Sequence, residues 1–221
     1  MESASFDKPV DLPPVSILEE RYPILKHMMT ILRDKTTDVA GFRETLKKIG
    51  YIVAGEATRP LKSKPKMIET PLAPYEGTEA AEPLTLVPIL RAGLGLAGGM
   101  LEVLPHARVS HVGLSRDEKT LEPHLYYQKI APDTASGLTV VVDPMLATAG
   151  TASYVIDMLR KKGCDRLVFA CIVASPEGIK VMQTKFPDVP IIAVALDDHL
   201  NDHGYIVPGL GDCGDRCYGT L

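Results

Sequence analysis

The fold of this chain is decided by one stretch, Val140-Val141-Val142-Asp143-Pro144-Met145-Leu146-Ala147-Thr148-Ala149-Gly150-Thr151. An apolar run suited to a buried strand ends in an acid, a turn of small and hydroxyl-bearing residues follows, and a helix is expected to begin near Thr151. A helix start offers free N–H groups and the positive end of the helix dipole to an anion. Asp143 can accept hydrogen bonds from sugar hydroxyls. The stretch therefore offers what a ribose 5-phosphate needs, although an ordinary strand and turn before a threonine-capped helix has the same local pattern.

Short runs rich in Val, Ile and Leu occur on both sides of this stretch. They predict strands at residues 84–90, 109–114, 138–142, 167–173 and 191–196, with helices at about 93–104, 150–162 and 177–186. This alternation predicts an α/β fold, an open and mostly parallel sheet flanked by helices. In such sheets ligands bind beyond the carboxyl ends of the strands, so the functional site is expected in the loops that follow them.

The N-terminal third is predicted to be a loose arm followed by helices. Residues 1–20 are assigned to the arm and 21–221 to the main domain, with helices over about 17–34 and 38–57. Thr37 or Asp38 is the expected cap of the second helix. Residues 58–83 contain five prolines and predict an extended arm with short strands, more suited to subunit contact than to chemistry.

Composition excludes several classes of protein. The 221 residues carry a net charge of −4 with acids and bases interspersed, which argues against a general nucleic-acid binder. No long apolar run predicts a membrane segment, so the cytoplasm is expected, with an organelle left open for a chain whose presequence was removed. The four cysteines are interpreted as buried thiols. His199 and His203 are four residues apart, but their loop-like surroundings argue against a metal site.

Two further loops carry charged residues directly after predicted strands. Arg91 ends the strand at 84–90 and is followed by glycines, a combination suited to phosphate oxygens, although a surface arginine at a turn has the same pattern. Residues 115–137 begin with the charged segment Ser115–Pro123. They form either a solvated hairpin or a flexible hood that closes over a substrate and brings Arg116 to it.

A fourth segment, residues 199–216, contains four glycines and a proline. These residues disfavour regular structure, so the segment is interpreted either as a flexible tail or as a loop whose backbone approaches a ligand closely.

The four segments together resemble the uracil-specific branch of the type I phosphoribosyltransferases. Residues 142–151 resemble the motif that binds 5-phosphoribosyl 1-diphosphate (PRPP), and Gly-Tyr-Ile-Val-Pro-Gly-Leu-Gly-Asp at 204–212 resembles the uracil-binding loop. The resemblance extends from His27 onward. It departs at Pro144, where many members carry a second acid, and at Ala149, where glycine is more usual.

The resemblance implies the type I phosphoribosyltransferase fold and a set of site residues. Arg116 and Asp212 are the implied catalytic residues. Uracil binding is implied for Ile206, Gly211, Asp212 and Cys213, mainly through the backbone. PRPP binding is implied for Arg91, Arg116, Asp143, Pro144, Met145, Leu146, Ala147, Thr148, Ala149, Gly150, Thr151 and Asp212.

The implied activity is the transfer of the 5-phosphoribosyl group of PRPP to N1 of uracil, giving UMP and diphosphate in pyrimidine salvage. The resemblance also implies Mg²⁺ carried in with PRPP and no metal site on the protein. It further implies a homodimer or homotetramer and GTP as an effector. Two alternatives stay open: another base preference on the same fold, and an inactive regulator that binds nucleotides and RNA. The acidic charge and the presence of Arg91 and Arg116 favour the enzyme.

Overall fold

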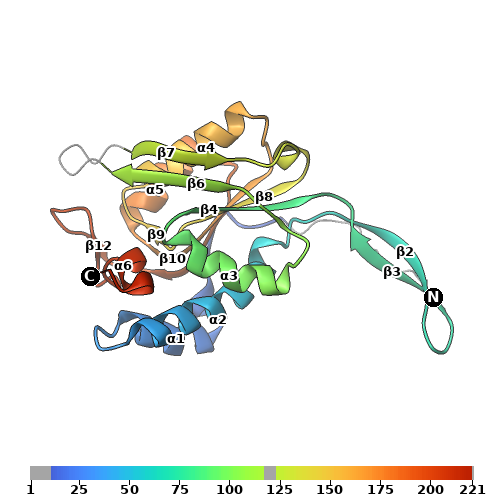
Figure 1. Ribbon diagram of the computed structural model, residues 1–221, viewed down its shortest axis with the longest axis horizontal. Coiled ribbons are helices and arrows are strands. Elements are labelled where there is room, and N and C mark those ends of the chain that lie inside the picture. The colour runs from blue at the N-terminus through green and yellow to red at the C-terminus, as the bar shows by residue number, and fades with distance from the viewer. Residues whose placement is uncertain (1–10, 117–122, 221) are drawn as a thin grey trace.

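A sheet of nine strands forms the centre of the computed structural model, which describes residues 11–116 and 123–220 (Figure 1). The strands are β1 (Val15–Ile17), β4 (Leu84–Leu90), β5 (Arg108–Val109), β6 (His111–Arg116), β7 (Pro123–Lys129), β8 (Leu138–Val142), β9 (Met145–Leu146), β10 (Leu167–Ala174) and β11 (Ile191–Leu196). The main path runs β1-β11-β10-β8-β4-β6-β7, with β5 beside β4 and β9 beside β10. Only the β6–β7 pair in this sheet is antiparallel among the described residues.

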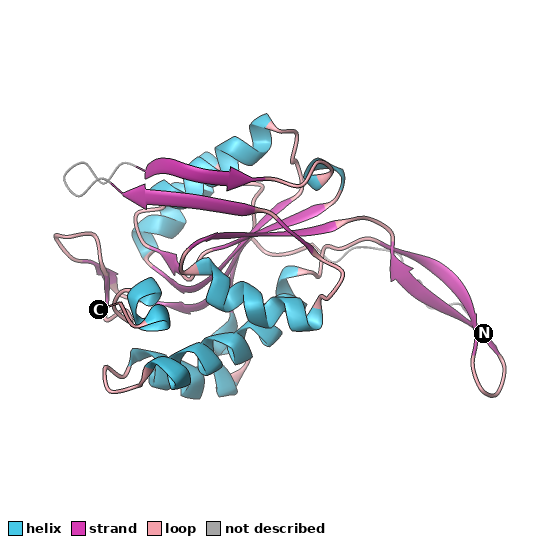
Figure 2. Cartoon of the chain, viewed as in Figure 1, coloured by secondary structure: helices cyan, strands magenta, loops and turns pink. Residues whose placement is uncertain are grey.

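Helices cover both faces of the sheet (Figure 2). They are α1 (Pro23–Arg33), α2 (Val39–Ala57), α3 (Gly93–Val103), α4 (Gly150–Lys161), α5 (Pro176–Lys185) and α6 (Cys213–Tyr218), with short 3₁₀ turns η1 (Leu18–Glu20) and η2 (Thr134–Ser136). Alternate residues of β8 point to opposite faces. Val140 and Val142 pack in the core with α1, α2 and α3, whereas Val141 packs with α4 and α5. This layering confirms the predicted α/β fold.

The N-terminal boundary differs from the prediction. Val15–Ile17 pairs in parallel with β11, and Leu18 is fully buried, so residues 15–20 belong to the edge of the sheet and not to a loose arm. The first helix begins at Pro23 and not near residue 17, because proline is favoured at the first helical position and lacks the N–H that a helix interior needs. Asp38 caps α2, accepting a hydrogen bond of 2.7 Å from the Gly41 N–H.

Regular structure is present in both the extended arm at 58–83 and the glycine-rich segment at 199–216. Residues 58–83 hold an antiparallel hairpin of β2 (Ser63–Glu69) and β3 (Pro74–Ala80), which projects away from the sheet (Figure 1). The segment at 199–216 contains the small hairpin of β12 (His199–Leu200) and β13 (Ile206–Val207), and then α6. The expectation that glycines would deny this segment regular structure is wrong, because Asp212 caps α6 and starts a helix despite Gly214.

The segment predicted as a hood begins as an antiparallel hairpin. β6 and β7 are paired from His111 and Lys129 up to Arg116 and Pro123, and the tip at 117–122 lies outside the described residues. All four cysteines are free and buried, as expected. In the described part of the chain, no helix is both long and apolar enough to cross a membrane.

Candidate active site

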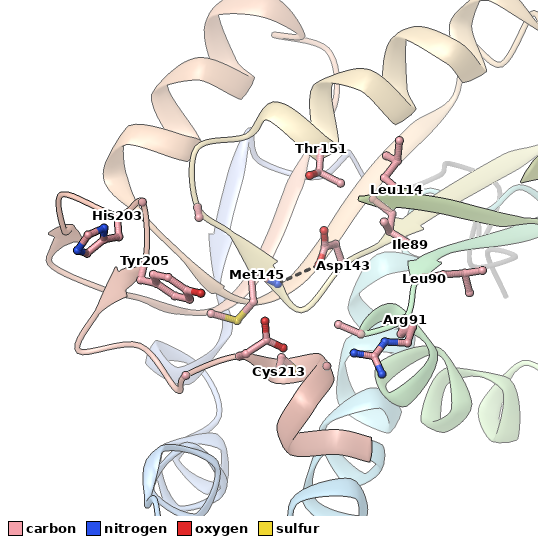
Figure 3. Close-up of a pocket in the computed structure, with 16 residues that line it drawn as sticks. Ile89, Leu90, Arg91, Leu114, Asp143, Met145, Thr151, His203, Tyr205 and Cys213 are labelled. Carbon is pink, nitrogen blue, oxygen red and sulfur yellow. Dashed lines mark hydrogen bonds between the residues drawn. The ribbon is translucent and has the colours of Figure 1, made fainter. Parts of the chain in front are cut away.

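A cavity of about 710 Å³ lies where the loops after several parallel strands meet (Figure 3). This is the edge of the sheet at which open α/β folds bind ligands. The cavity is lined by Ile89, Leu90, Arg91, Ala92, Leu114, Asp143, Met145, Ala147, Thr151, His203, Gly204, Tyr205, Gly211, Asp212, Cys213 and Gly214.

The loop after β4 brings Arg91 to the cavity. A Cβ atom at Gly93 would lie 2.5 Å from the Val142 carbonyl oxygen, so only glycine lets this loop pass the end of the neighbouring β8. The Arg91 guanidinium donates to the Asp215 carboxylate across 2.9 Å and lies 5.7 Å from the centre of the Tyr218 ring. Its side chain is 51% exposed, so this cation is accessible to a ligand.

The loop after β8 supplies a carboxylate and a helix N-terminus. Asp143 accepts a hydrogen bond of 3.3 Å from the Met145 N–H, which turns the chain sharply after the strand. Ala149 adopts a left-handed conformation with φ of 63° and precedes α4, whose second residue, Thr151, lines the cavity. The N–H groups of the first turn of α4 and the helix dipole favour an anion at this place.

The chain after β11 closes the opposite side. Figure 3 shows His203 and Tyr205 across the cavity from Arg91, with Met145 and Asp143 between them. Asp212 also lines the cavity, and its Oδ1 accepts a hydrogen bond of 2.8 Å from the Asp215 N–H, which orients the carboxylate.

The Cys213 thiol is buried, and burial raises its pKa far above the ordinary value, with smaller contributions from neighbouring groups such as Cys217 and Asp143. The thiol therefore stays neutral near pH 7 and is not a nucleophile there. Because the thiol is buried, Cys213 would contact a ligand mainly through its backbone.

Eight of the fifteen expected site residues meet at the cavity. Arg91, Asp143, Met145, Ala147, Thr151, Gly211, Asp212 and Cys213 line it. Pro144, Leu146, Thr148, Ala149, Gly150 and Ile206 are not among the lining residues. The Leu146 and Ile206 side chains pack into the core, so only their backbones are available for a ligand. Arg116 ends β6, and its side chain lies outside what the structure describes.

Sequence reasoning missed several lining residues. Tyr205 and Gly204 stood within the glycine-rich segment, but that segment was expected to act through other positions. His203 was considered only as a metal ligand. The apolar residues Ile89, Leu90 and Leu114 gave no signal, because strand ends are apolar in any buried sheet.

Metal ligands do not gather here in the usual protein arrangement. Within residues 11–116 and 123–220, no group of three or more His, Cys, Asp or Glu side chains could hold a metal ion. The carboxylates among the lining residues are Asp143 and Asp212, from different loops.

Comparison with known proteins identifies the family of the chain. The family model described as Uracil phosphoribosyltransferase matches residues 20–220. The chain belongs to the uracil phosphoribosyltransferase family. This confirms the resemblance inferred from the four segments, and it makes the chain an enzyme of the pentosyltransferase class.

Similar proteins cover this chain almost end to end. The chain is 46% identical to the uracil phosphoribosyltransferase of Levilactobacillus brevis over 90% of its own length and 96% of the relative's. It is 48% identical to that of Paracoccus denitrificans over 90% and 95% of the two lengths. A solved structure, that of the AQ2163 protein from Aquifex aeolicus, superposes with a TM-score of 0.87 at 36% identity, covering 92% of this chain and 97% of that one.

Proposed function

We propose that the 710 Å³ cavity is where this chain transfers the 5-phosphoribosyl group of PRPP to N1 of uracil, giving UMP and diphosphate. The observation that carries the proposal is the meeting of three elements at one cavity. These are an exposed arginine after β4, a carboxylate followed by a helix N-terminus after β8, and a backbone-rich loop at 211–213. The three match the diphosphate, the ribose 5-phosphate and the base of the two substrates.

PRPP is expected to lie between the loops after β4 and β8. The N-terminus of α4 suits the 5-phosphate, with the Thr151 hydroxyl as a further donor. Asp143 suits the ribose hydroxyls. Arg91, and Arg116 at the end of β6, suit the diphosphate, because a guanidinium presents a planar fork to phosphate oxygens. Residues 144–150 form the rest of this cradle, and Met145 and Ala147 among them line the cavity.

Uracil is expected on the side formed by residues 203–214. Gly211, Asp212 and Cys213 offer backbone groups to the cavity, and Tyr205 adds an aromatic side chain. A pyrimidine ring held by backbone N–H and C=O groups is read by its pattern of donors and acceptors. Ile206 anchors the same segment in the core.

The reaction forms the N1–C1′ bond as the bond from C1′ to the diphosphate oxygen breaks, and the N1 proton is lost. Positive charge grows on the ribose and negative charge on the leaving group. Arg91 and Arg116 would stabilise the leaving group electrostatically, and Asp143 would balance the emerging cation. Asp212 is held by its hydrogen bond from the Asp215 N–H, which favours a role in orienting the base or its proton.

Mg²⁺ is expected to arrive bound to PRPP. Pro144 stands where many family members carry a second acid, so this loop offers one carboxylate, Asp143, with Asp212 on another loop. Such a donor set suits an ion that keeps much of its own water and is held mainly by the substrate's oxygens. When bound, the ion neutralises charge on the diphosphate.

The projecting hairpin of β2 and β3 is expected to contact a second copy of the chain. It exposes the apolar side chains Met67, Ile68, Leu72 and Tyr75, and an isolated hairpin gains little stability in water. We therefore expect a homodimer or homotetramer. A response to GTP also stays an expectation.

A turnover assay with purified chain tests the proposed function. Uracil and PRPP with Mg²⁺ should yield UMP and diphosphate in equal amounts, and omission of PRPP should abolish the reaction. Turnover of another base in place of uracil would point to a different base preference. Absence of any turnover with tight nucleotide binding would point to an inactive regulator.

A further inference from the structure

An ion pair outside the cavity holds the base-side loop. Arg33, the last residue of α1, binds the Asp197 carboxylate through both terminal nitrogens, at 2.8 Å and 2.5 Å. Asp197 directly follows β11, and its side chain is only 3% exposed. The Arg33 side chain is 26% exposed, so the pair is partly buried, and the loss of hydration offsets much of the attraction in such a pair. Its position therefore calls for a reason other than stability.

Both backbone polar groups of Gly209 are bound by this pair. The Gly209 N–H donates to Asp197 across 2.7 Å, and the Gly209 carbonyl accepts from Arg33 at 2.7 Å. Gly209 has a φ of +63°, and a Cβ there would lie 2.2 Å from the Ile206 carbonyl oxygen, so the backbone is fixed in a shape that only glycine adopts. Gly211, two positions after Gly209, is the next residue of this segment that lines the cavity.

A second arginine binds the next residue of the same loop. Arg216 donates to the Leu210 carbonyl at 2.8 Å, and also to the carbonyls of Leu32 and, at 2.6 Å, Asp34. Its guanidinium stacks 4.5 Å from the centre of the Phe42 ring. The last carbonyls of a helix lack intrahelical partners, so Arg216 ties the loop to the end of α1.

We propose that Arg33, Asp197 and Arg216 are positioning residues for uracil: they bind the backbone of residues 209 and 210 and thereby fix the direction of the backbone groups at 211–213. The inference rests on the proposed function of the cavity. None of the three residues lines the cavity. They act through the loop, whereas the PRPP side is built mainly on β4 and β8.

The test is to measure the Michaelis constants for uracil and for PRPP in two variants, Arg33→Lys and Arg216→Lys. Lysine keeps the positive charge beside Asp197 but has a single nitrogen, which cannot reproduce the planar fork to a carboxylate and a carbonyl. We expect the Michaelis constant for uracil to rise at least fivefold while that for PRPP changes less than twofold. Preference for uracil over cytosine should fall as well, because a loosened loop reads the base edge less strictly.

Arg160→Lys is the matched control. Arg160 binds both oxygens of Asp188 at 2.5 Å and stacks 5.3 Å from the Phe186 ring centre, yet it is not a cavity residue. The Arg160→Lys variant should lose thermal stability, but its Michaelis constant for uracil should not rise. Equal changes in both Michaelis constants, or an unchanged constant for uracil, would overturn the inference. If Arg33→Lys does not fold, Arg216→Lys decides alone. A wild type that turns over no uracil would instead refute the proposed function.

Discussion

Arg91 and Asp215 form a hydrogen-bonded ion pair, 2.9 Å long, that joins the loop after β4 to helix α6. A hydrogen bond from Thr220, and after it the one from Arg91, lowers the pKa of Asp215, so this carboxylate is charged throughout the neutral range. The arginine proposed to hold diphosphate thus already has an anionic partner. Diphosphate must share Arg91 with Asp215 or displace it.

The first prediction is that Asp215→Asn strengthens diphosphate binding. Exposed ion pairs contribute about 0–1 kcal/mol, so removal of the competing charge should tighten product inhibition by up to about fivefold. Because the pKa of Asp215 is lowered, the carboxylate is protonated only below its ordinary range, and the difference between variant and wild type should be constant from pH 6 to 8. Weaker diphosphate inhibition in the variant would show that Asp215 instead holds Arg91 in its binding position.

The second prediction concerns Arg116. Loss of one charge-assisted contact to the leaving group is expected to cost about 2–4 kcal/mol in the transition state, by analogy with single oxyanion donors. Steady-state kinetics of Arg116→Ala should show turnover at least tenfold lower, with uracil binding little changed. Arg108→Ala, at an arginine on the adjacent β5 paired with Asp133, is the control and should keep normal turnover. Normal turnover in Arg116→Ala would remove this residue from the site.

The third prediction concerns Asp143. Asp143→Asn keeps the shape, and its amide oxygen can still accept from the Met145 N–H, so the fold should survive. Hydrogen bonds to a charged group contribute about 1.5–3 kcal/mol, so PRPP affinity should fall at least tenfold, measured by calorimetric titration. Turnover should fall too. Wild-type values of both quantities would contradict the assignment of Asp143 to the ribose.

The fourth prediction separates backbone strain from packing at Ala149. Ala149 and Ala152 are both 2% exposed, but only Ala149 has a left-handed backbone. Each change to glycine loses a buried methyl, about 0.8 kcal/mol, and adds unfolded-chain entropy of about 0.4–1 kcal/mol. At Ala149 relief of about 1–2 kcal/mol of left-handed strain offsets these losses.

Denaturant unfolding should therefore place Ala149→Gly near the wild type and Ala152→Gly about 1–2 kcal/mol below it. Equal destabilisation of the two variants would mean that Ala149 carries no strain that glycine relieves.

The fifth prediction concerns base choice. Backbone groups have fixed polarity, and cytosine reverses two of the polarities that uracil presents, at the O4 and N3 positions. Each buried mismatch costs about 1–3 kcal/mol, so uracil should be preferred by about 30-fold to 10⁴-fold in kcat/KM. Cys213→Ser should keep this preference, since the Cys213 side chain is buried and the backbone is proposed to read the base. Comparable use of cytosine by the wild type would contradict uracil specificity, and lost preference in Cys213→Ser alone would contradict readout by the backbone.

The sequence predicted elements that leave a periodic trace over many residues. Five strands of the sheet and the long helices α2, α3, α4 and α5 are found within a few residues of their predicted places. β1 was missed because three residues are too few to show a period, and its pairing with β11 depends on residues far away in the chain. α6 was missed because glycine outweighed the capping signal of Asp212.

The site could be predicted where residues act within one loop, as at Asp143 and Thr151. Contacts between distant segments could not be predicted, because they leave no pattern in the sequence. Asp197 resembles any acid after a strand, and nothing near it in the sequence indicates its partner Arg33, which lies 164 positions away. The same holds for Arg91 and Asp215, which are 124 positions apart. Such pairs are created by tertiary packing, which a periodic pattern does not encode.

The Arg33–Asp197 pair can form only late in protein synthesis, because its partners lie 164 positions apart. A chain made from its N-terminus completes the strands and loops of the PRPP side, through Thr151, well before Asp197, Gly209 and Arg216 leave the ribosome. Arg33 has by then no carboxylate of its own to bind. The loop at 209–213 can therefore take its final shape only after nearly the whole chain has been made, and recognition of a base waits for the last helix to pack against the end of the first.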